Sequence, residues 1–353
     1  MTKMHGGKIL ARRLADYGSQ RVFSVPGESF LAALDGLYEY QIDNVVCRQE
    51  GGAAMMAEAH AKLTGETGVL FVTRGPGATN ASSGLHVAMH DATPMVCFVG
   101  QVPLKHRDRG VFQEVDYRAF FGPLVKWVAE VESTDRISEY VAKAFQVANS
   151  GRPGPVVLAL PEDVLSGVAD DAAPMTSGKV ETAFSDRQLA DVTALLDQAE
   201  RPMMILGGSP WDAATGQIAA EAAYRWGMPI AATFRRQDYV DNDHPNYAGD
   251  LGVGMNPKLG ERLVDADLVV LVGAELNDIT TKDFTLLDLE RPPRIVQISR
   301  DPAAFGKNYP IELGYLAEPS EVLAALRGAR PDEAGPDRGA KSARADYEAW
   351  QTP

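Results

Sequence analysis

The sequence has little cysteine and no long apolar run, and each absence excludes a class of protein. Cys47 and Cys97 are the only cysteines in 353 residues, and both lie in apolar, strand-like stretches. Two buried thiols are too few for a disulfide framework and indicate a reducing compartment. No window reaches the roughly 18 apolar residues of a membrane-spanning helix, and residues 1–8 contain no apolar core of a signal peptide. We therefore expect a cytoplasmic protein without a membrane partner.

Positive charge is also scarce. The 34 lysines and arginines are outnumbered by 48 aspartates and glutamates, which gives a formal net charge of −14. Nucleic acids and anionic membranes are bound through basic patches, so neither is expected as a partner. The hydrophobic content of 45% and the 33 glycines favour a globular α/β protein with a sizeable core. A chain of this length predicts two domains.

Two common nucleotide-binding motifs are missing. The run Gly-Pro-Gly at 75–77 is not followed by Gly-Lys-Ser/Thr, so it is not a Walker motif. The first expected strand, 21–25, leads into Pro-Gly-Glu-Ser at 26–29 and not into Gly-x-Gly-x-x-Gly, which argues against a Rossmann dehydrogenase. Taken singly, the two glycine-containing runs indicate tight turns.

Short apolar runs alternate with helical segments in the first part of the chain. Strands are expected at 21–25, 44–47, 69–73, 95–99 and 156–160. This alternation predicts a parallel sheet that is covered by helices on both faces. Ligands of such sheets bind beyond the carboxyl ends of the strands. The segments at 26–27, 50, 73–80 and 100–101 each follow a strand, so we expect them to meet on one rim.

A second alternation follows a stretch without apolar periodicity. Residues 167–186 are rich in Ala, Asp, Gly, Ser and Thr, which predicts a linker. Further strands are expected at 203–206, 229–232, 268–272 and 294–299. The predicted fold class is α/β, with two doubly wound domains whose mainly parallel sheets are flanked by helices. The domains are expected at 1–166 and 187–328, and 329–353 is expected to be a second linker.

One carboxylate stands alone on the expected rim. Glu50 follows the apolar run 44–47, which predicts a buried strand, and precedes Gly51, Gly52 and a helix of small residues. A carboxylate at a helix N-terminus is stabilised by the helix dipole, which would explain Glu50 without any ligand. The lack of bulk behind it would equally let a large, flat group come close. This stretch alone leaves both interpretations open.

In combination, the rim motifs are more specific. They are Val-Pro-Gly at 25–27, Arg-Gln-Glu-Gly-Gly-Ala-Ala at 48–54, Val-Thr-Arg-Gly-Pro-Gly-Ala-Thr-Asn at 72–80, Gly-Gln-Val-Pro at 100–103, Phe-Gln-Glu-Val-Asp at 112–116 and Gly-Arg-Pro-Gly-Pro-Val at 151–156. In order and spacing, this series resembles the thiamine-diphosphate-dependent enzymes related to acetolactate synthase. The resemblance implies a pyrimidine-binding domain at 1–166 and the family's central domain at 187–328. It also implies a transferase or lyase that decarboxylates or ligates a 2-oxo acid, or cleaves an acyloin-type substrate.

The resemblance assigns roles to residues of the rim. Thiamine diphosphate reacts as a C2 carbanion, and the imino tautomer that generates it needs a proton donor at the pyrimidine N1′. Glu50 is expected to be this donor, since a carboxyl among apolar groups can share a proton with a ring nitrogen. The rest of the pyrimidine pocket is implied at Pro26, Gly27, Thr73, Pro76 and Asn80. Phe112 and Gln113 are expected to face the substrate at a neighbouring subunit's cofactor, with Gln113 as a neutral hydrogen-bond donor.

Several residues depart from the acetolactate synthase pattern. Glu28 replaces the second Gly of Pro-Gly-Gly, Gln49 replaces the His before the catalytic Glu, and Glu162 replaces the Lys of Leu-Pro-Lys-Asp-Val. An acid near the substrate channel should disfavour the binding of an anionic 2-oxo acid acceptor. Glu275 stands where a basic residue of the family would meet FAD, and an acid there would repel phosphates. FAD is therefore a disfavoured second cofactor.

The family's diphosphate-binding signature is missing as well. It consists of Gly-Asp-Gly and a later Asn-Asn, which hold Mg²⁺ and the diphosphate, and no Gly-Asp-Gly occurs in this sequence. No metal ligand is therefore assigned here, and the chain alone is expected to be inactive. It is either part of a longer enzyme, which we favour, or a non-catalytic or split subunit that needs a diphosphate-domain partner. Because the family's active site lies between two chains, a homodimer or homotetramer is expected.

Overall fold

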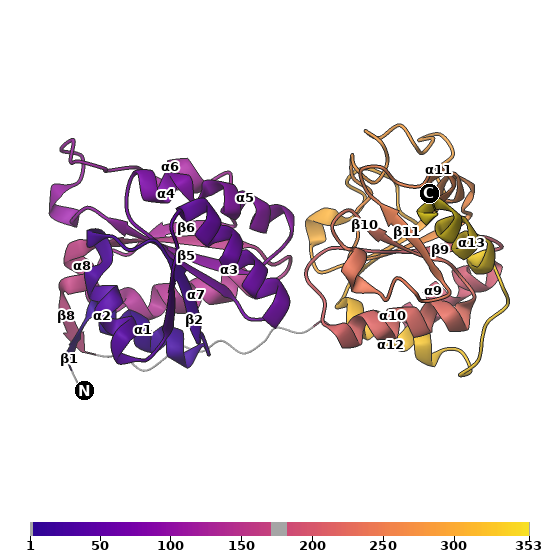
Figure 1. The fold of residues 1–353 in the computed structure, drawn as a ribbon. Coiled ribbons are helices and arrows are strands. Elements are labelled where there is room, and N and C mark those ends of the chain that lie inside the picture. Colours follow the sequence, from indigo (N-terminus) through magenta and orange to yellow (C-terminus); the bar gives the residue numbers. More distant parts are fainter. Residues whose placement is uncertain (1–2, 171–181, 353) are drawn as a thin grey trace. The chain divides into compact units, whose positions relative to one another are not determined.

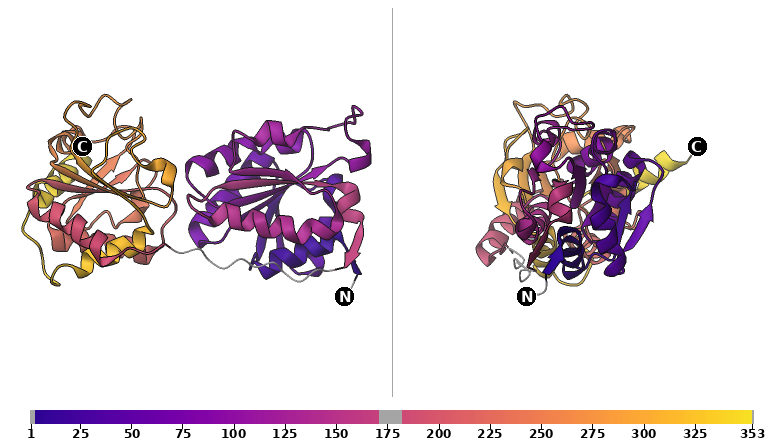
Figure 2. Two further views of the ribbon diagram at one scale, coloured as in Figure 1. Left: turned by 180° about the vertical axis from the view of Figure 1, so that it is seen from behind. Right: turned by 90° about the vertical axis from the view of Figure 1, so that its left-hand side faces the viewer.

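The computed structural model describes residues 3–170 and 182–352 (Figure 1). The chain divides into two compact units, Met1–Lys179 and Val180–Pro353. Each unit contains one six-stranded parallel sheet with helices on both faces, so the predicted α/β class with two doubly wound domains is confirmed. Figure 2 shows the two helical layers of each sheet from behind.

The first sheet has the strand order β3-β2-β4-β5-β7-β6. Its strands are β2 (Arg21–Ser24), β3 (Asp43–Val46), β4 (Gly68–Val72), β5 (Met95–Gln101), β6 (Trp127–Glu130) and β7 (Pro155–Pro161). The central strands β4, β5 and β7 are buried throughout, as their continuous apolar runs require. An antiparallel pair, β1 (Lys3–His5) and β8 (Val168–Asp170), lies beside the sheet.

Helices of different composition cover the two faces of this sheet (Figure 1). One face carries α1 (Gly6–Asp16), α2 (Leu31–Glu39) and α7 (Ile137–Asn149), whose leucines, isoleucines and aromatic residues form the larger core. The other face carries α3 (Glu50–Thr64), α4 (Pro76–Asn80), α5 (Ser82–His90) and α6 (Tyr117–Phe121). The small helix α8 (Glu162–Ser166) follows β7.

Small side chains let α3 pack closely against its neighbours. Ala53, Ala54 and Ala57 are fully buried on this helix. A Cβ atom on Gly84 of α5 would lie 2.4 Å from the Ala54 Cβ, and one on Gly68 of β4 would lie 2.4 Å from the Ala57 carbonyl oxygen. The small residues that follow Glu50 in the sequence are thus explained by the close packing of α3 on α5 and β4.

The expectation of a buried strand before Glu50 is wrong. The strand β3 is the edge strand of the sheet, and Val46 at its end is 63% exposed. Cys47 was expected to be buried and is only partly so, whereas Cys97 on the central strand β5 is fully buried. An apolar run of four residues does not distinguish an edge strand from a central one, because pairing with a single neighbour leaves one side open.

The second sheet has the strand order β11-β10-β9-β12-β13-β14. Its strands are β9 (Pro202–Leu206), β10 (Ile230–Thr233), β11 (Tyr247–Leu251), β12 (Leu268–Val272), β13 (Arg294–Ser299) and β14 (Leu313–Leu316). The helices α9 (Asp186–Gln198), α10 (Ala213–Trp226) and α12 (Pro319–Gly328) pack on one face. The helices α11 (Pro257–Asp265) and α13 (Ala340–Gln351) pack on the other.

The structure differs from the expected segments at both linkers. Residues 168–170, which were expected in the first linker, form β8 and pair with β1. Residues 171–181 of that linker lie outside the described residues. In the expected second linker, α13 packs on the second sheet, where the Tyr347 ring lies 5.1 Å from that of Tyr247. Asp346 of the same helix pairs with Lys258 and Arg262 of α11.

Candidate functional site

The expected rim residues surround the point where the order of the first sheet reverses. Strand β3 lies on one side of β2 and β4 lies on the other, so the segments that follow β2 and β4 leave the sheet in different directions. In α/β sheets, ligands bind in a crevice at the carboxyl ends of the strands that flank such a switch point. Residues 26–27 follow β2, and residues 73–80 follow β4.

The segments after β2 and β4 are in direct contact. A Cβ atom on Gly27 would lie 2.5 Å from the Cβ of Thr73, so a larger residue at position 27 would force the two segments apart. The hydroxyls of Ser29 and Thr73 are hydrogen-bonded at 2.8 Å. Gly27 and Thr73, which come from segments far apart in the sequence, therefore form one wall of the crevice.

The carboxylate of Glu50 lies against the segment after β4. Helix α3 begins at Glu50, and the side chain of Gln49 caps it by accepting a hydrogen bond from the Gly52 amide at 2.7 Å. Glu50 is half-buried, and its Oε2 accepts a hydrogen bond from Asn80 Nδ2 at 3.2 Å. A Cβ atom on Gly77 would lie 3.4 Å from Glu50 Oε1. Within the described part of the chain, Oε1 of Glu50 has no hydrogen-bond partner, whereas Oε2 bonds Asn80.

The Gln113 backbone lies directly against the Gly-Pro-Gly turn. Gly75 has φ +62°, and a Cβ atom on it would lie 2.8 Å from the Cβ of Gln113, which itself has φ +66°. The Gly75 amide donates a hydrogen bond to the Tyr117 hydroxyl at 2.9 Å. Burial raises the pKa of Tyr117 to about 12, so this hydroxyl stays protonated at neutral pH. Glycine is required at 75 by both its conformation and the contact with Gln113.

Four of the expected site residues are exposed: Pro26, Pro76, Asn80 and Phe112. Pro26 and Pro76 lie at the surface of the crevice segments, and the Phe112 side chain is 77% exposed. The structure therefore brings together Gly27, Thr73, Glu50, Asn80 and Gln113 through contacts with one another or with the segment 73–80. Among the described residues, it shows no such contact for Phe112.

The sequence did not reveal the common partner of Glu28 and Glu162, two of the residues that depart from the acetolactate synthase pattern. Glu28 and Glu162 both pair with Arg74: the Arg74 Nη2 lies 2.9 Å from Glu28 Oε1, and its Nη1 bonds Glu162 Oε1. The Arg74 side chain is only 10% exposed. Glu28, Arg74 and Glu162 follow β2, β4 and β7, so the sequence does show a charged residue after each of three strands. It does not show which of these strands lie next to one another.

The loop that carries Gln113 is anchored by a charged cluster. Arg107 lies 3.1 Å from Glu114 and 2.5 Å from Glu130 of β6, and Gln101 donates a hydrogen bond to the Val115 carbonyl at 3.0 Å. A cavity of about 140 Å³ lies beside Arg107, and it is lined by Arg107, Asp116, Tyr117, Arg118, Val128, Ala129, Glu130, Glu132 and Ala159. These contacts fix both ends of the 107–115 segment and hold Gln113 in place.

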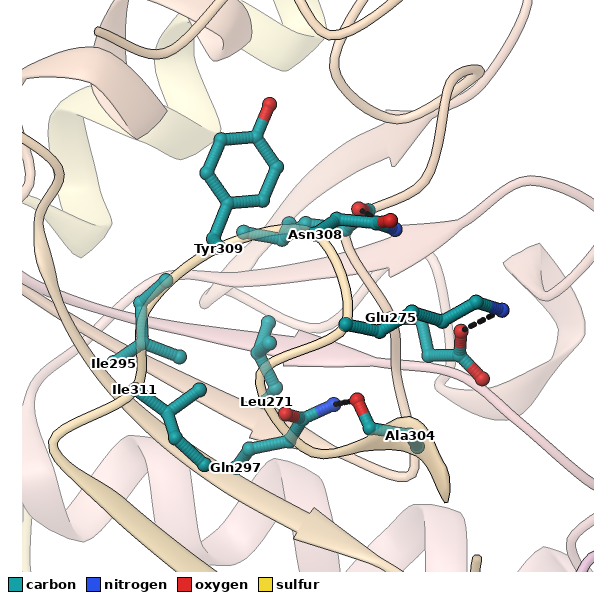
Figure 3. Close-up of a pocket in the computed structure, with 10 residues that line it drawn as sticks. Leu271, Glu275, Ile295, Gln297, Ala304, Asn308, Tyr309 and Ile311 are labelled. Carbon is teal, nitrogen blue, oxygen red and sulfur yellow. Dashed lines mark hydrogen bonds and ion pairs between the residues drawn. The ribbon is translucent and has the colours of Figure 1, made fainter. Parts of the chain in front are cut away.

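The second unit offers a small pocket around Glu275 (Figure 3). Glu275 pairs with Lys307 at 3.3 Å, so its charge is balanced by a neighbour. The pocket has a volume of about 20 Å³, which is room for one water molecule and not for a dinucleotide. The segments after β9 and β12 also touch, since a Cβ atom on Gly208 would lie 2.3 Å from the Gly273 carbonyl oxygen. This pocket is therefore too small for FAD.

The polar groups at the rim of the first sheet are the Glu50 carboxylate, the Asn80 amide, the Thr73 hydroxyl and backbone groups. Within residues 3–170 and 182–352, no three His, Cys, Asp or Glu side chains are arranged to hold a metal ion. Over the same residues, no helix is long and apolar enough to cross a membrane.

Comparison with known proteins identifies the class. Residues 4–120 match the family model of the thiamine pyrophosphate enzyme N-terminal TPP-binding domain, and residues 189–326 match that of the thiamine pyrophosphate enzyme central domain. Together the two models cover more than half of the chain. The chain therefore belongs to the thiamine pyrophosphate (thiamine diphosphate) enzyme family, and the resemblance expected from the rim motifs is confirmed.

Within this family, the chain is similar to large subunits of acetolactate synthases. It is 31% identical over 324 residues to the acetolactate synthase isozyme 2 large subunit of Escherichia coli, and 31% identical over 333 residues to the isozyme 3 large subunit. It is 29% identical over 333 residues to a probable acetolactate synthase large subunit of Methanocaldococcus jannaschii. Each alignment covers 92% of this chain but only 56 to 59% of the relative. The chain thus spans little more than half the length of these curated relatives.

Proposed function

We propose that this chain supplies the pyrimidine-binding and central domains of a thiamine-diphosphate-dependent carboligase or decarboxylase that acts on a 2-oxo acid. The observation that carries the proposal is the position of Glu50, which meets Asn80 and Gly77 at the switch point of the first sheet. The diphosphate and its Mg²⁺ would be held by residues that this chain does not supply. The complete site would lie between two copies of the full-length protein.

The residues of the crevice fit an aminopyrimidine ring. One Glu50 oxygen is left for a ring nitrogen, and glycines at 27 and 77 let the backbone segments approach a flat group closely. Pro26, Thr73 and Pro76 would line the edges of the ring. When bound, thiamine diphosphate supplies the carbanion stabilisation that the chemistry of 2-oxo acids requires.

Each residue would have a separate task. Glu50 would hold a proton at the pyrimidine N1′, and Asn80 would orient the Glu50 carboxylate through its hydrogen bond. Gln113 would donate a neutral hydrogen bond to a substrate carbonyl or a developing oxyanion. The exposed ring of Phe112 would cover the substrate at the neighbouring subunit and exclude water from it.

The test is Glu50→Gln in the full-length protein, assayed with thiamine diphosphate and Mg²⁺. An amide cannot exchange a proton with the pyrimidine nitrogen, so we expect turnover to fall by about 10²- to 10⁴-fold, the usual contribution of a positioned acid or base. The rate of hydrogen–deuterium exchange at the cofactor C2, followed by NMR, should fall in parallel.

A matched control for this variant lies at the other end of the same helix. Glu66 follows the C-terminus of α3 and pairs with His60 at 3.3 Å, away from the rim. Glu66→Gln should leave turnover unchanged. Near wild-type turnover in Glu50→Gln would remove the central claim of the proposal.

A non-catalytic or split subunit is the alternative. The two proposals differ in what completes the site: a longer form of this chain, or a separate diphosphate-domain protein. Turnover by the purified full-length protein without any added chain would decide for the first, and turnover that depends on a co-purified second chain would decide for the alternative.

A further inference from the structure

The guanidinium of Arg74 is enclosed by two carboxylates at the rim of the proposed site. Its two terminal nitrogens bond Glu28 and Glu162, and its Nε is buried without a hydrogen-bond partner in the described part of the chain. Arg74 lies between Thr73, which contacts Gly27, and Gly75, which contacts Gln113. The cluster of Glu28, Arg74 and Glu162, called here the rim triad, therefore adjoins the residues assigned to the cofactor and the substrate.

An arginine in this place would ordinarily attract a carboxylate. The planar guanidinium presents parallel N–H groups that match the two oxygens of a carboxylate, which makes arginine the preferred partner of anionic substrates. Here both terminal nitrogens already donate to carboxylates of the chain itself. An incoming substrate carboxylate would have to compete with these two carboxylates for the guanidinium, and it would also meet a cluster whose formal charge is −1.

Stabilisation of the fold does not by itself explain the triad. The side chain of Glu28 is 74% exposed and that of Glu162 is 37% exposed. Ion pairs with partners this exposed add little to stability, because water and salt screen them. Their charges act instead on a charged ligand bound beside them, because like charges at short range repel one another even in water.

We propose that Glu28 and Glu162 occupy the anion-binding nitrogens of Arg74, so that this site selects an uncharged aldehyde or ketone as acceptor over a 2-oxo acid. The choice of acceptor rests on the proposed function, which makes the crevice a substrate site. This occupation of the Arg74 nitrogens by Glu28 and Glu162, called masking below, involves residues of this chain alone. It can therefore be measured without turnover.

The first experiment measures masking in the chain itself. Acetate and acetone have nearly the same shape and differ in charge, so they serve as the two probes. Binding is followed by NMR at the Arg74 Nε–H and the Gly75 amide. We expect neither probe to shift these signals in the wild-type chain at millimolar concentrations. In the Glu28→Gln, Glu162→Gln double variant, acetate should shift them saturably and acetone should not.

Two further variants keep this result interpretable. Glu28→Gln alone changes an exposed side chain, so it is expected to fold normally and to show a weaker acetate response than the double variant. Glu312→Gln removes an acid that bonds Arg294 at 2.5 and 2.7 Å in the second unit, and it should leave the Arg74 signals unresponsive. An equal acetate response in the wild-type chain and the double variant would overturn the masking.

The second experiment measures selectivity in the full-length protein with thiamine diphosphate and Mg²⁺. The ratio of kcat/KM for propanal to that for pyruvate as acceptor should favour propanal in the wild type. Each removed charge should lower this ratio by about fivefold, the effect of one charge–charge interaction at about 4 Å in water. A ratio that Glu162→Gln leaves unchanged would overturn the selectivity, whereas the proposed function would stand. A wild-type protein without any turnover would instead overturn the proposed function, and the acetate titration would still decide the masking.

Discussion

At the scale of single residues, Gly75 connects the proposed cofactor segment to the substrate loop. Its φ of +62° disfavours any L side chain, and a Cβ would lie 2.8 Å from the Gln113 Cβ. Gly75→Ala should therefore lower the free energy of unfolding by about 2 to 4 kcal/mol, made up of backbone strain and the displacement of Gln113. Turnover of the full-length protein should fall with it.

Gly65 gives a matched control for the conformational part of this loss. It ends α3 with φ +75°, and no atom lies within 4 Å of the place where its Cβ would stand. Gly65→Ala should cost about 1 kcal/mol in urea denaturation, which is the strain alone. If both variants lose the same stability, the contact between Gly75 and Gln113 contributes nothing.

Some contacts of single residues at the candidate site could be predicted from the sequence motifs, and others could not. Glu50, Thr73 and Gly75 could be placed on one rim, because residues that follow parallel strands must lie at the same edge of a sheet. The pairing of Arg74 with Glu28 and Glu162 could not, since it joins positions 46 and 88 residues apart. Such contacts depend on the order of the strands in space, which the alternation of strands and helices leaves open.

At the scale of elements, α13 is held to α11 by Asp346. Hydrogen bonds from Lys258 and Arg262 lower the pKa of Asp346 below its usual value. A lowered pKa in the folded chain stabilises the fold at pH values above the unfolded pKa of about 3.9, and this stabilisation disappears as the pH falls through the folded value. Asp346→Asn should thus cost about 0.5 to 1 kcal/mol at pH 7, because the partners are partly exposed.

The pH dependence distinguishes this effect from a general loss of packing. Urea denaturation of the wild type and Asp346→Asn should differ at pH 7 and coincide at pH values well below 3.9. Asp243, whose side chain is 97% exposed and lies 3.9 Å from Arg344, is a control position where the same substitution should have no effect. A difference that persists unchanged at low pH would assign the loss to something other than the carboxylate.

Elements escaped prediction where their sequences lack a clear apolar period. The strands β11 and β14 are short and contain glycine, and β11 also contains an aspartate. Helix α13 follows prolines, and only Ala340 and Ala343 of its residues are buried, so its sequence resembles a charged linker. Long, buried strands such as β5 and β12 were placed correctly, because a continuous apolar run of that kind fits only the interior of a sheet.

At the scale of the whole molecule, each unit has its own sheet, two helical layers and its own buried clusters. A unit with a complete core should fold without the other. We therefore expect residues 182–353, produced alone, to unfold cooperatively in urea, with the midpoint that this unit has in the whole chain. Asp346→Asn should shift that midpoint in the isolated unit as much as in the whole chain, whereas Gly75→Ala should shift only the first unit. A fragment 182–353 without a cooperative transition would mean that the second core needs residues of the first unit, and the two sheets would then be one folding unit despite their separate cores.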